Sequence, residues 1–246
     1  VAAAVRPDLL YGVYAVADAG GGRPAKLVIA ESRAAAVHVG GKPISESPRI
    51  ATVTGRELIG KTYRRPFDII PMPADRAHSV MIPGQFVTAQ DGSGIVHMAP
   101  AFGADDYSAG QEHGLAMVRP VAPDGTFTGT TWPEIEGKLV TADETNELII
   151  RRLKAEGRHL LTEQYVHSYP HCWRCSSKLI YYARDSWFVR TTAVKQRMLQ
   201  INAAVDWNPP EVGAGRFGEW LENNVDWAIS RVRYWGPRLP VRVCVC

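Results

Sequence analysis

The sequence contains no uninterrupted apolar run near the roughly 20 residues that a membrane-spanning helix requires. The stretch VAAAVRPDLL lacks the cationic start and cleavage site of a secretion signal, and no internal repeat or low-complexity segment is present. Hydrophobic residues make up 46% of the chain and the net charge is only +3, which excludes the composition of a disordered protein. We therefore expect a soluble cytoplasmic protein of one large or two ordinary domains, without membrane association.

The small net charge conceals an uneven distribution along the chain. Residues 1–150 carry 13 basic and 17 acidic side chains, whereas residues 151–246 carry 15 basic and 8 acidic ones. A basic segment beside an acidic one favours a polyanionic partner, because lysines and arginines that contact phosphates release condensed counterions.

The few cysteines form two close pairs at the ends of one long interval. They are Cys172 and Cys175, in the order C-W-R-C, and Cys244 and Cys246, in the order C-V-C. A C-x-x-C turn presents two thiolates to one tetrahedral Zn²⁺, and a second close pair can complete a structural site of four cysteines. Disulfides are the competing interpretation, but a C-x-C pair does not easily bridge to itself. The aromatic, proline-rich and serine-rich surroundings of Cys172 favour a zinc knuckle over a redox motif.

Glycine and proline turns divide the first part of the chain into short segments of strand character. Strands are predicted over residues 11–16, 26–30, 81–87 and 94–98, with turns at residues 20–24, 40–43 and 90–94, the last of which joins the third and fourth strands.

Two helices and a domain boundary follow from end signals and from composition. A helix is predicted from Ala104 to His113, with Gly114 as its stop, and a second one opens on a capping box from Thr141 to Glu144 and ends at Gly157. From residue 164 onward the sequence becomes aromatic and basic, so we place a boundary near residue 160. The tryptophans at 187, 207, 220, 227 and 235 are interpreted as core or docking residues rather than platforms for RNA bases.

The richest chemistry lies in residues 92–107, GSGIVHMAPAFGADDY. Here a glycine turn leads into a strand that ends near His97, followed by an irregular loop and a helix that starts with two acids. A histidine at a strand end and Asp106 at a helix start can face one pocket, with free backbone N–H groups between them. The alternative is purely structural, with Asp106 serving the helix end and His97 hydrogen-bonded in the core.

Several blocks resemble one family of enzymes. Residues 92–107 closely resemble the signature of the editing domain inserted into class I isoleucyl-tRNA synthetases. GRELIGKTYRRPF at residues 55–67 resembles an upstream block of that insertion, and SYPHCWRC at residues 168–175 resembles its exit. FGEWLENNVDWAISRVRYWG at residues 217–236 is similar to the return into the nucleotide-binding core.

The resemblance implies an α/β chain with two parts. Residues 1–160 would form a mostly β, barrel-like editing domain. Residues 161–246 would form a mixed, zinc-binding segment that returns to a Rossmann-type core. The implied function is hydrolysis of valine from tRNA(Ile), with the alternatives of a non-catalytic tRNA-docking and zinc-binding module and of a hydrolase that uses a metal held by the cysteines. The implied partners are the 3′ end of tRNA(Ile) carrying valine and the remaining synthetase domains.

The resemblance also assigns roles to individual residues. Asp106 matches the acid that grips the α-ammonium group of the substrate, a charge-assisted contact. His97 matches the histidine at the side-chain and ribose pocket, where its bulk can exclude isoleucine. Ala101, Phe102 and Gly103 lie between them and are the expected substrate-binding residues, while Asp105 is expected to serve only the helix end.

The chain departs from the family pattern in two respects. It lacks the threonine-rich strand that helps to bind the adenosine, and it lacks the His-Ile-Gly-His and Lys-Met-Ser-Lys-Ser motifs of amino-acid activation. We therefore expect an internal fragment of a longer synthetase, in which ATP and Mg²⁺ serve only the full-length enzyme. The resemblance also implies that each cysteine pair is half of a different zinc site. A single site of four cysteines is the alternative, and the zinc is structural in both.

Overall fold

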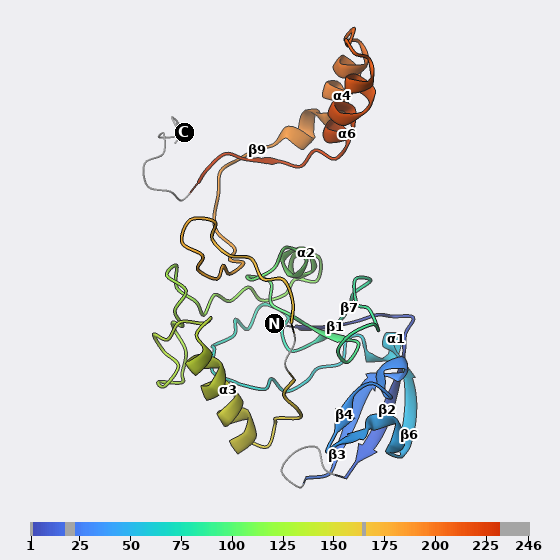
Figure 1. Ribbon diagram of the computed structural model, residues 1–246, viewed down its shortest axis with the longest axis vertical. Helices are drawn as coiled ribbons and strands as arrows, with labels where there is room; N and C mark the ends of the chain where they lie inside the picture. The colour runs from blue at the N-terminus through green and yellow to red at the C-terminus, as the bar shows by residue number, and fades with distance from the viewer. Residues whose placement is uncertain (1, 18–22, 164–165, 232–246) are drawn as a thin grey trace. The chain divides into compact units, whose positions relative to one another are not determined.

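The protein is described here by a computed structural model covering residues 2–17, 23–163 and 166–231 (Figure 1). The chain forms two compact units, residues 1–183 and residues 184–246. The domain boundary that the sequence indicates near residue 160 stays a prediction. Most of the glycine-rich turn predicted at residues 20–24 lies outside the described residues.

The first unit combines short strands with three α-helices. Its strands are β1 (Ala2–Val5), β2 (Leu10–Val16), β3 (Ala25–Ala30), β4 (His38–Val39), β5 (Lys42–Pro43), β6 (Arg49–Thr54), β7 (Met81–Pro83) and β8 (Ile95–Met98). Its helices are α1 (Gly55–Leu58), α2 (Ala104–Glu112) and α3 (Asp143–Ala155), with the 3-10 turns η1 (Glu31–Arg33) and η2 (Ile44–Glu46). The strands predicted at 11–16, 26–30 and 94–98 are thus confirmed, while the one predicted at 81–87 ends at Pro83, which has no N–H to donate.

The sheet that carries the candidate site has the strand order β7-β1-β8. Strand β1 lies in the middle, parallel to β7 and antiparallel to β8, so that Ala3 is opposite both Met81 and His97. The predicted turn at residues 90–94 leads into β8, and the two strands on either side of it along the chain are not paired with each other, because β1 lies between β7 and β8.

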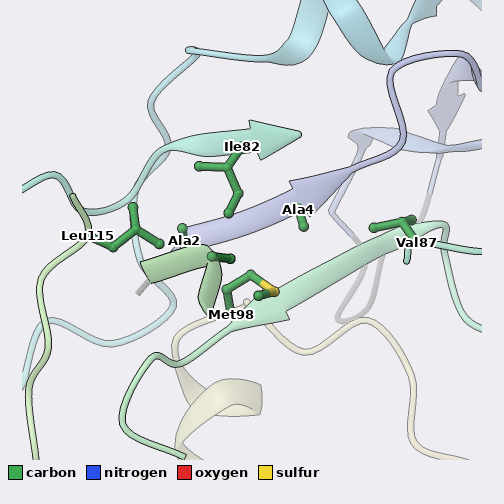
Figure 2. Close-up of a cluster of buried hydrophobic side chains, with 7 residues drawn as sticks. Ala2, Ala4, Ile82, Val87, Met98 and Leu115 are labelled. Atoms are coloured by element: carbon green, nitrogen blue, oxygen red, sulfur yellow. The ribbon is translucent and has the colours of Figure 1, made fainter. Parts of the chain in front are cut away.

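A compact hydrophobic cluster supports this sheet. Figure 2 shows it gathered around β1, whose Ala2 and Ala4 are small enough to let larger side chains approach. The cluster consists of Ala2, Ala4, Ile82, Val87, Met98, Ala109 and Leu115, of which Ala109 belongs to α2. Helix α2 is therefore fixed to the same core as the strand that precedes it.

A second sheet, β3-β2-β6, is antiparallel throughout and holds the turn that leads into β8. The fully buried Tyr11 of β2 donates its hydroxyl hydrogen to the carbonyl of Gly94 at 2.8 Å and accepts the N–H of Arg6 at 3.1 Å. Gly94 has φ +74°, and a Cβ there would overlap Ala30 of β3, so glycine is required for both the turn and the close packing.

The helix ends follow the sequence signals in part. Helix α2 stops before Gly114, whose φ of +59° confirms the predicted stop. The capping box predicted from Thr141 to Glu144 is wrong: α3 starts at Asp143 without a side-chain cap, and Glu144 pairs with Lys138 at 3.5 Å instead of reaching back. A capping box does form at the start of α1, between Thr54 and Glu57.

The barrel-like architecture predicted for residues 1–160 is also wrong. Their described residues form separate sheets of two or three strands and no closed barrel, because irregular segments separate β6 from β7 and α2 from α3. The mixed α/β class is confirmed. Among the described residues, none of the helices has the length and apolarity to cross a membrane.

The second unit is mainly helical in its described part. It contains η3 (Thr191–Val194), α4 (Lys195–Ala203), α5 (Glu211–Ala214), α6 (Arg216–Glu222) and the strand pair β9 (Phe188–Val189) and β10 (Trp227–Ala228). Its exposed large side chains include Trp187, Phe188, Trp220, Val225 and Trp227. The Rossmann-type core predicted for this part of the chain stays a prediction.

Candidate functional site

The candidate site is built where β8 ends and α2 begins. The chain leaves β8 at Met98 and turns at once, with the N–H of Phe102 donating to the carbonyl of Ala99 at 2.8 Å. Pro100 in this turn can lie close to α2 because Gly110 of that helix has no side chain. A Cβ there would lie 2.8 Å from Cβ of Pro100.

Asp106 closes the loop between strand and helix. Its Oδ1 accepts the N–H of Ala99 at 2.6 Å, and the residue is only partly exposed. Its Oδ2 lies over Gly103, in the space that a Cβ of residue 103 would occupy. Because Asp106 stands in the first turn of α2, the unpaired N–H groups at that helix end favour its negative charge. The structural role of Asp106, support of the loop, therefore uses Oδ1, and Oδ2 remains for the chemical role that the sequence predicts.

His97 is one of the residues that line an apolar pocket of about 440 Å³. This apolar pocket is lined by Arg65, Pro66, Phe67, Ile69, Ile70, His97, Ala99, Pro100, Phe102, Val118, Pro120, Val121, Phe127, Val140 and Ile180. The residue is exposed on β8, and apolar side chains of the pocket surround part of it. This burial lowers the pKa of His97 from its usual 6.5, while the carboxylate of Asp106 raises it.

The loop residues predicted to bind substrate have different environments. Phe102 lines the apolar pocket and packs edge-on against Tyr182, with ring centroids 5.9 Å apart. Ala101 is buried, and its carbonyl accepts the N–H of Ala183 at 2.8 Å. Gly103 is the residue before α2 and contacts Asp106. The structure thus brings His97, Phe102 and Asp106 around one loop, while Asp105 is exposed.

The wall of the pocket opposite His97 was not predicted from the sequence. It comes from the irregular segment at residues 65–70, from residues 118–121 and from Ile180. Tyr182 connects two of these segments, because its hydroxyl donates to the carbonyl of Val121 at 2.8 Å. The apolar residues of these segments indicate burial in the sequence. That the segments meet at one pocket follows only from the tertiary structure.

Two of the four predicted zinc ligands lie on a tight turn. The N–H of Cys172 donates to Ser177, the N–H of Ser176 donates back to Cys172, and both bonds are 2.8 Å long. Hydrogen bonds from Ser177 to Cys175 lower the pKa of the Cys175 thiol to about 7. Within the described ranges, no third His, Cys, Asp or Glu joins them in a metal-binding group. Cys244 and Cys246 lie outside the described residues.

Comparison with known proteins yields one family. The sequence profile of tRNA synthetases class I (I, L, M and V) matches residues 26–244. Isoleucine–tRNA ligases of Streptomyces coelicolor and Thermus thermophilus are 42% and 38% identical over 99% of this chain. The chain spans only 22% of the length of each. Among solved structures, the crystal structure of GlLeuRS-CP1 matches 67% of this chain and 78% of its own, with 16% identity and a TM-score of 0.47.

Proposed function

The chain belongs to the class I tRNA synthetases of the I, L, M and V group, and we propose that it hydrolyses valine from mischarged tRNA(Ile). The high identity to isoleucine–tRNA ligases supports the choice of tRNA. Attachment of isoleucine, with its need for ATP and Mg²⁺, is proposed only for proteins of the relatives' full length.

A separate hydrolytic site has a clear physical purpose in this family. One methylene group distinguishes isoleucine from valine and is worth only about 1–3 kcal/mol to a binding pocket, a general value for which isoleucyl-tRNA synthetase is itself the standard example. A second site that accepts the smaller amino acid and cleaves its ester removes the errors that remain. The partner is therefore the 3′ end of tRNA(Ile) that carries valine.

The observation that carries the proposal is the arrangement of His97 and Asp106 on either side of Ala99. The Asp106 carboxylate acts on the imidazole of His97, so the two side chains share one electrostatic environment. Oδ1 of Asp106 is held by Ala99, which leaves the carboxylate able to bind the α-ammonium group of an aminoacyl ester through Oδ2. The apolar pocket beside His97 is suited to an aliphatic side chain.

The reaction is ester hydrolysis. The oxygen of a water molecule attacks the ester carbonyl carbon, the bond to the ribose oxygen breaks, and that oxygen leaves with a proton, so that valine and free tRNA are the products. We assign no proton-accepting side chain. His97, whose lowered pKa favours the uncharged ring at neutral pH, contributes its bulk to the pocket wall, and Asp106 orients the substrate.

The test separates the charge of Asp106 from its support of the loop. In Asp106→Asn the side-chain oxygen can still accept the N–H of Ala99, but the negative charge is lost. We expect deacylation of valyl-tRNA(Ile) to fall by about 100-fold or more, because a charge-assisted contact to a partly buried group is worth roughly 3 kcal/mol. The matched control is Asp105→Asn, which removes the same charge one residue earlier on the exposed side of α2.

The wild-type chain should cleave valyl-tRNA(Ile) faster than isoleucyl-tRNA(Ile), and thermal unfolding should be the same in both variants. Equal activity of the two variants would show that the charge of Asp106 has no part in catalysis. A folded wild-type chain that hydrolyses neither ester would support the non-catalytic docking module instead.

We also propose that Cys172 and Cys175 bind a structural zinc ion. Two thiols on one turn, one of them with a pKa near 7, suit a metal that binds thiolates. Cys244 and Cys246 remain proposed ligands, either of the same ion or of another. Zinc content measured on Cys172→Ser should be lower than on Ser176→Ala, a neighbouring change that leaves both thiols in place.

A further inference from the structure

A second cavity, of about 540 Å³, adjoins the apolar pocket and differs from it in character. It lies between the segment Thr62–Asp68, the residues His78 and Ser79, and the end of α3 with the residues that follow it. Four arginines line it, at positions 64, 65, 152 and 158, against two carboxylates, Asp68 and Glu156. We call it the cationic pocket.

The acids of the cationic pocket do not neutralise it. Glu156 pairs with Arg152 at 2.8 Å and with Arg158 at 3.1 Å, and Asp68 pairs with Arg65. The hydrogen bond from Arg152, and then the charges of Arg158, Arg152 and Arg64, lower the pKa of Glu156. Two acids thus face four guanidinium groups, and a positive excess remains.

Of the positive charges in the cationic pocket, that of Arg64 is available to a ligand. It is exposed, and it makes no hydrogen bond or ion pair with any residue in the described ranges. Arg152, in contrast, is held by Glu156 and stacks over the ring of Trp132, 4.2 Å from the centroid. The pocket thus combines an arginine held in place, Arg152, with an arginine free to bind a ligand, Arg64. This combination suits an anion with several oxygens, since guanidinium groups bind phosphate through paired N–H donors.

The two pockets share part of their walls. Arg65 and Phe67 line both the apolar pocket, which contains His97, and the cationic pocket. The Arg65 side chain is 13% exposed and is fixed by Asp68 and by the carbonyl of Ile70. An aliphatic group in the apolar pocket and an anionic group in the cationic pocket would therefore lie next to the same two residues, Arg65 and Phe67.

We propose that the cationic pocket binds a backbone phosphate of the RNA strand whose aminoacyl end occupies the apolar pocket. This inference rests on the proposed editing function and adds a positioning site to it. An aminoacyl-RNA is the ligand that joins an apolar side chain to phosphodiester groups within one molecule. Phosphate contacts fix the register of a nucleic acid without reading its sequence, which suits a site that recognises the attached amino acid.

The experiment uses the full chain and a fluorescein-labelled, single-stranded RNA that ends in CCA. Binding is followed by fluorescence anisotropy over a series of chloride concentrations. The variant is Arg64→Gln, because Arg65, Arg152 and Arg158 all make structural bonds whose loss would confuse the result. The control is Arg151→Gln, which removes an equally exposed arginine from α3 outside both pockets.

We expect Arg64→Gln to weaken RNA binding roughly three- to five-fold at low salt, the loss typical of one partly exposed charge contact. The slope of log K against log salt should become shallower by about 0.7, the value for one phosphate of a single strand. Arg151→Gln should leave both quantities at the wild-type value. The same effect in both variants, or none in Arg64→Gln, overturns the proposal.

Two further measurements separate this proposal from the proposed editing function and from a site for free phosphate. If RNA binding depends on Arg64 but the wild-type chain cleaves no ester, the editing function fails while the phosphate site stands. Thermal unfolding with inorganic phosphate, against chloride at equal ionic strength, tests the other source of the same anion. Stabilisation by free phosphate that requires Arg64, with RNA binding independent of Arg64, would show a free-phosphate site and overturn the RNA assignment.

Discussion

At the scale of the residue, the two oxygens of Asp106 have different surroundings. Oδ1 holds the strand-to-helix loop through Ala99, and Oδ2, the oxygen proposed to bind the ammonium group of the substrate, lies against Gly103. The position of Oδ2 depends on residue 103 having no side chain. Its φ of −162° suits any residue, so the requirement for glycine comes from space alone.

Gly103→Ala should therefore affect activity more than stability. The added Cβ would overlap Oδ2 and push the carboxylate away from the ammonium site, while a carboxylate at the end of a short side chain can rotate at little cost. We expect deacylation of valyl-tRNA(Ile) to fall by about 10-fold or more and the unfolding free energy to change by less than about 1 kcal/mol. Single-turnover deacylation and urea unfolding measure the two. A large loss of stability without loss of activity would contradict this account.

The pKa of His97 gives a second prediction at this scale. Burial lowers the pKa below 6.5 and Asp106 opposes that shift, so Asp106→Asn should lower it further. NMR titration of the imidazole should give a midpoint below 6.5 in the wild type and a still lower one in the variant. Since the unfolded chain takes up the proton more readily, His97 should also make the folded state less stable as the pH falls below about 6.5. A midpoint above 6.5 would show that the pocket does not shield the ring.

At the scale of the element, a buried hydroxyl group joins β2 to the turn before β8. Tyr11 bonds the carbonyl of Gly94 and the N–H of Arg6, and it is fully buried. The N–H of Ala30 also donates to the carbonyl of Ser93, at 2.9 Å, so contacts from the second sheet together set the position where β8 begins.

Tyr11→Phe should destabilise the fold by about 1–3 kcal/mol, because it leaves two buried backbone groups without partners. Tyr14→Phe on the same strand is the control, since the Tyr14 hydroxyl makes no hydrogen bond among the described residues. Hydrogen exchange should show faster exchange around residues 92–98 in Tyr11→Phe alone. Equal stability of the two variants would mean that the Gly94 contact contributes little.

The elements that could be predicted are those with strong local signals. The acids at the start of α2 and Gly114 after its end gave its bounds closely, and alternating Val, Ile and Tyr gave β2 and β3. Strand β1 was missed because AAAV has weak strand propensity and becomes a central strand only through tertiary pairing. The capping box was placed at Thr141 instead of Thr54 because the competing bond of Glu144 to Lys138 is not visible in the sequence.

The candidate site could be predicted only where its residues are close in sequence. His97, Phe102 and Asp106 lie at the end of β8, in the loop that follows and at the start of α2, and a known motif marks them. The wall formed by Arg65 and Phe67 lies some thirty residues earlier, and the cationic pocket adds residues of α3, so neither follows from local spacing. The roles of Asp106 as a substrate ligand and of the cysteines as zinc ligands stay predictions.

At the scale of the whole molecule, the second unit exposes an unusual amount of apolar surface. Trp220 is 62% exposed and Trp227 63% exposed, while Leu221 of α6 is 3% exposed. The relatives are several times longer than this chain. We expect that further domains in those proteins cover the corresponding surface.

The isolated chain should therefore associate with itself as its concentration rises. Trp220→Gln removes a large exposed ring, and we expect it to shift the sedimentation distribution toward the monomer and to reduce binding of an apolar dye. The control is Trp173→Gln, because Trp173 is an exposed tryptophan of the first unit, whereas Trp132 is buried. Equal improvement from Trp173→Gln would show that the association is not specific to the second unit.

The central position of β1 has a consequence for the order in which the protein is made. The residues Ala2–Val5 have as their partners strands that begin only at Met81 and Ile95. During synthesis this segment has no partner in its sheet until Met81–Pro83 has left the ribosome, and its second partner, Ile95–Met98, follows later. Pairing over such long separations is slow. His97, which stands opposite Ala3, therefore acquires its final position at the moment when the sheet closes.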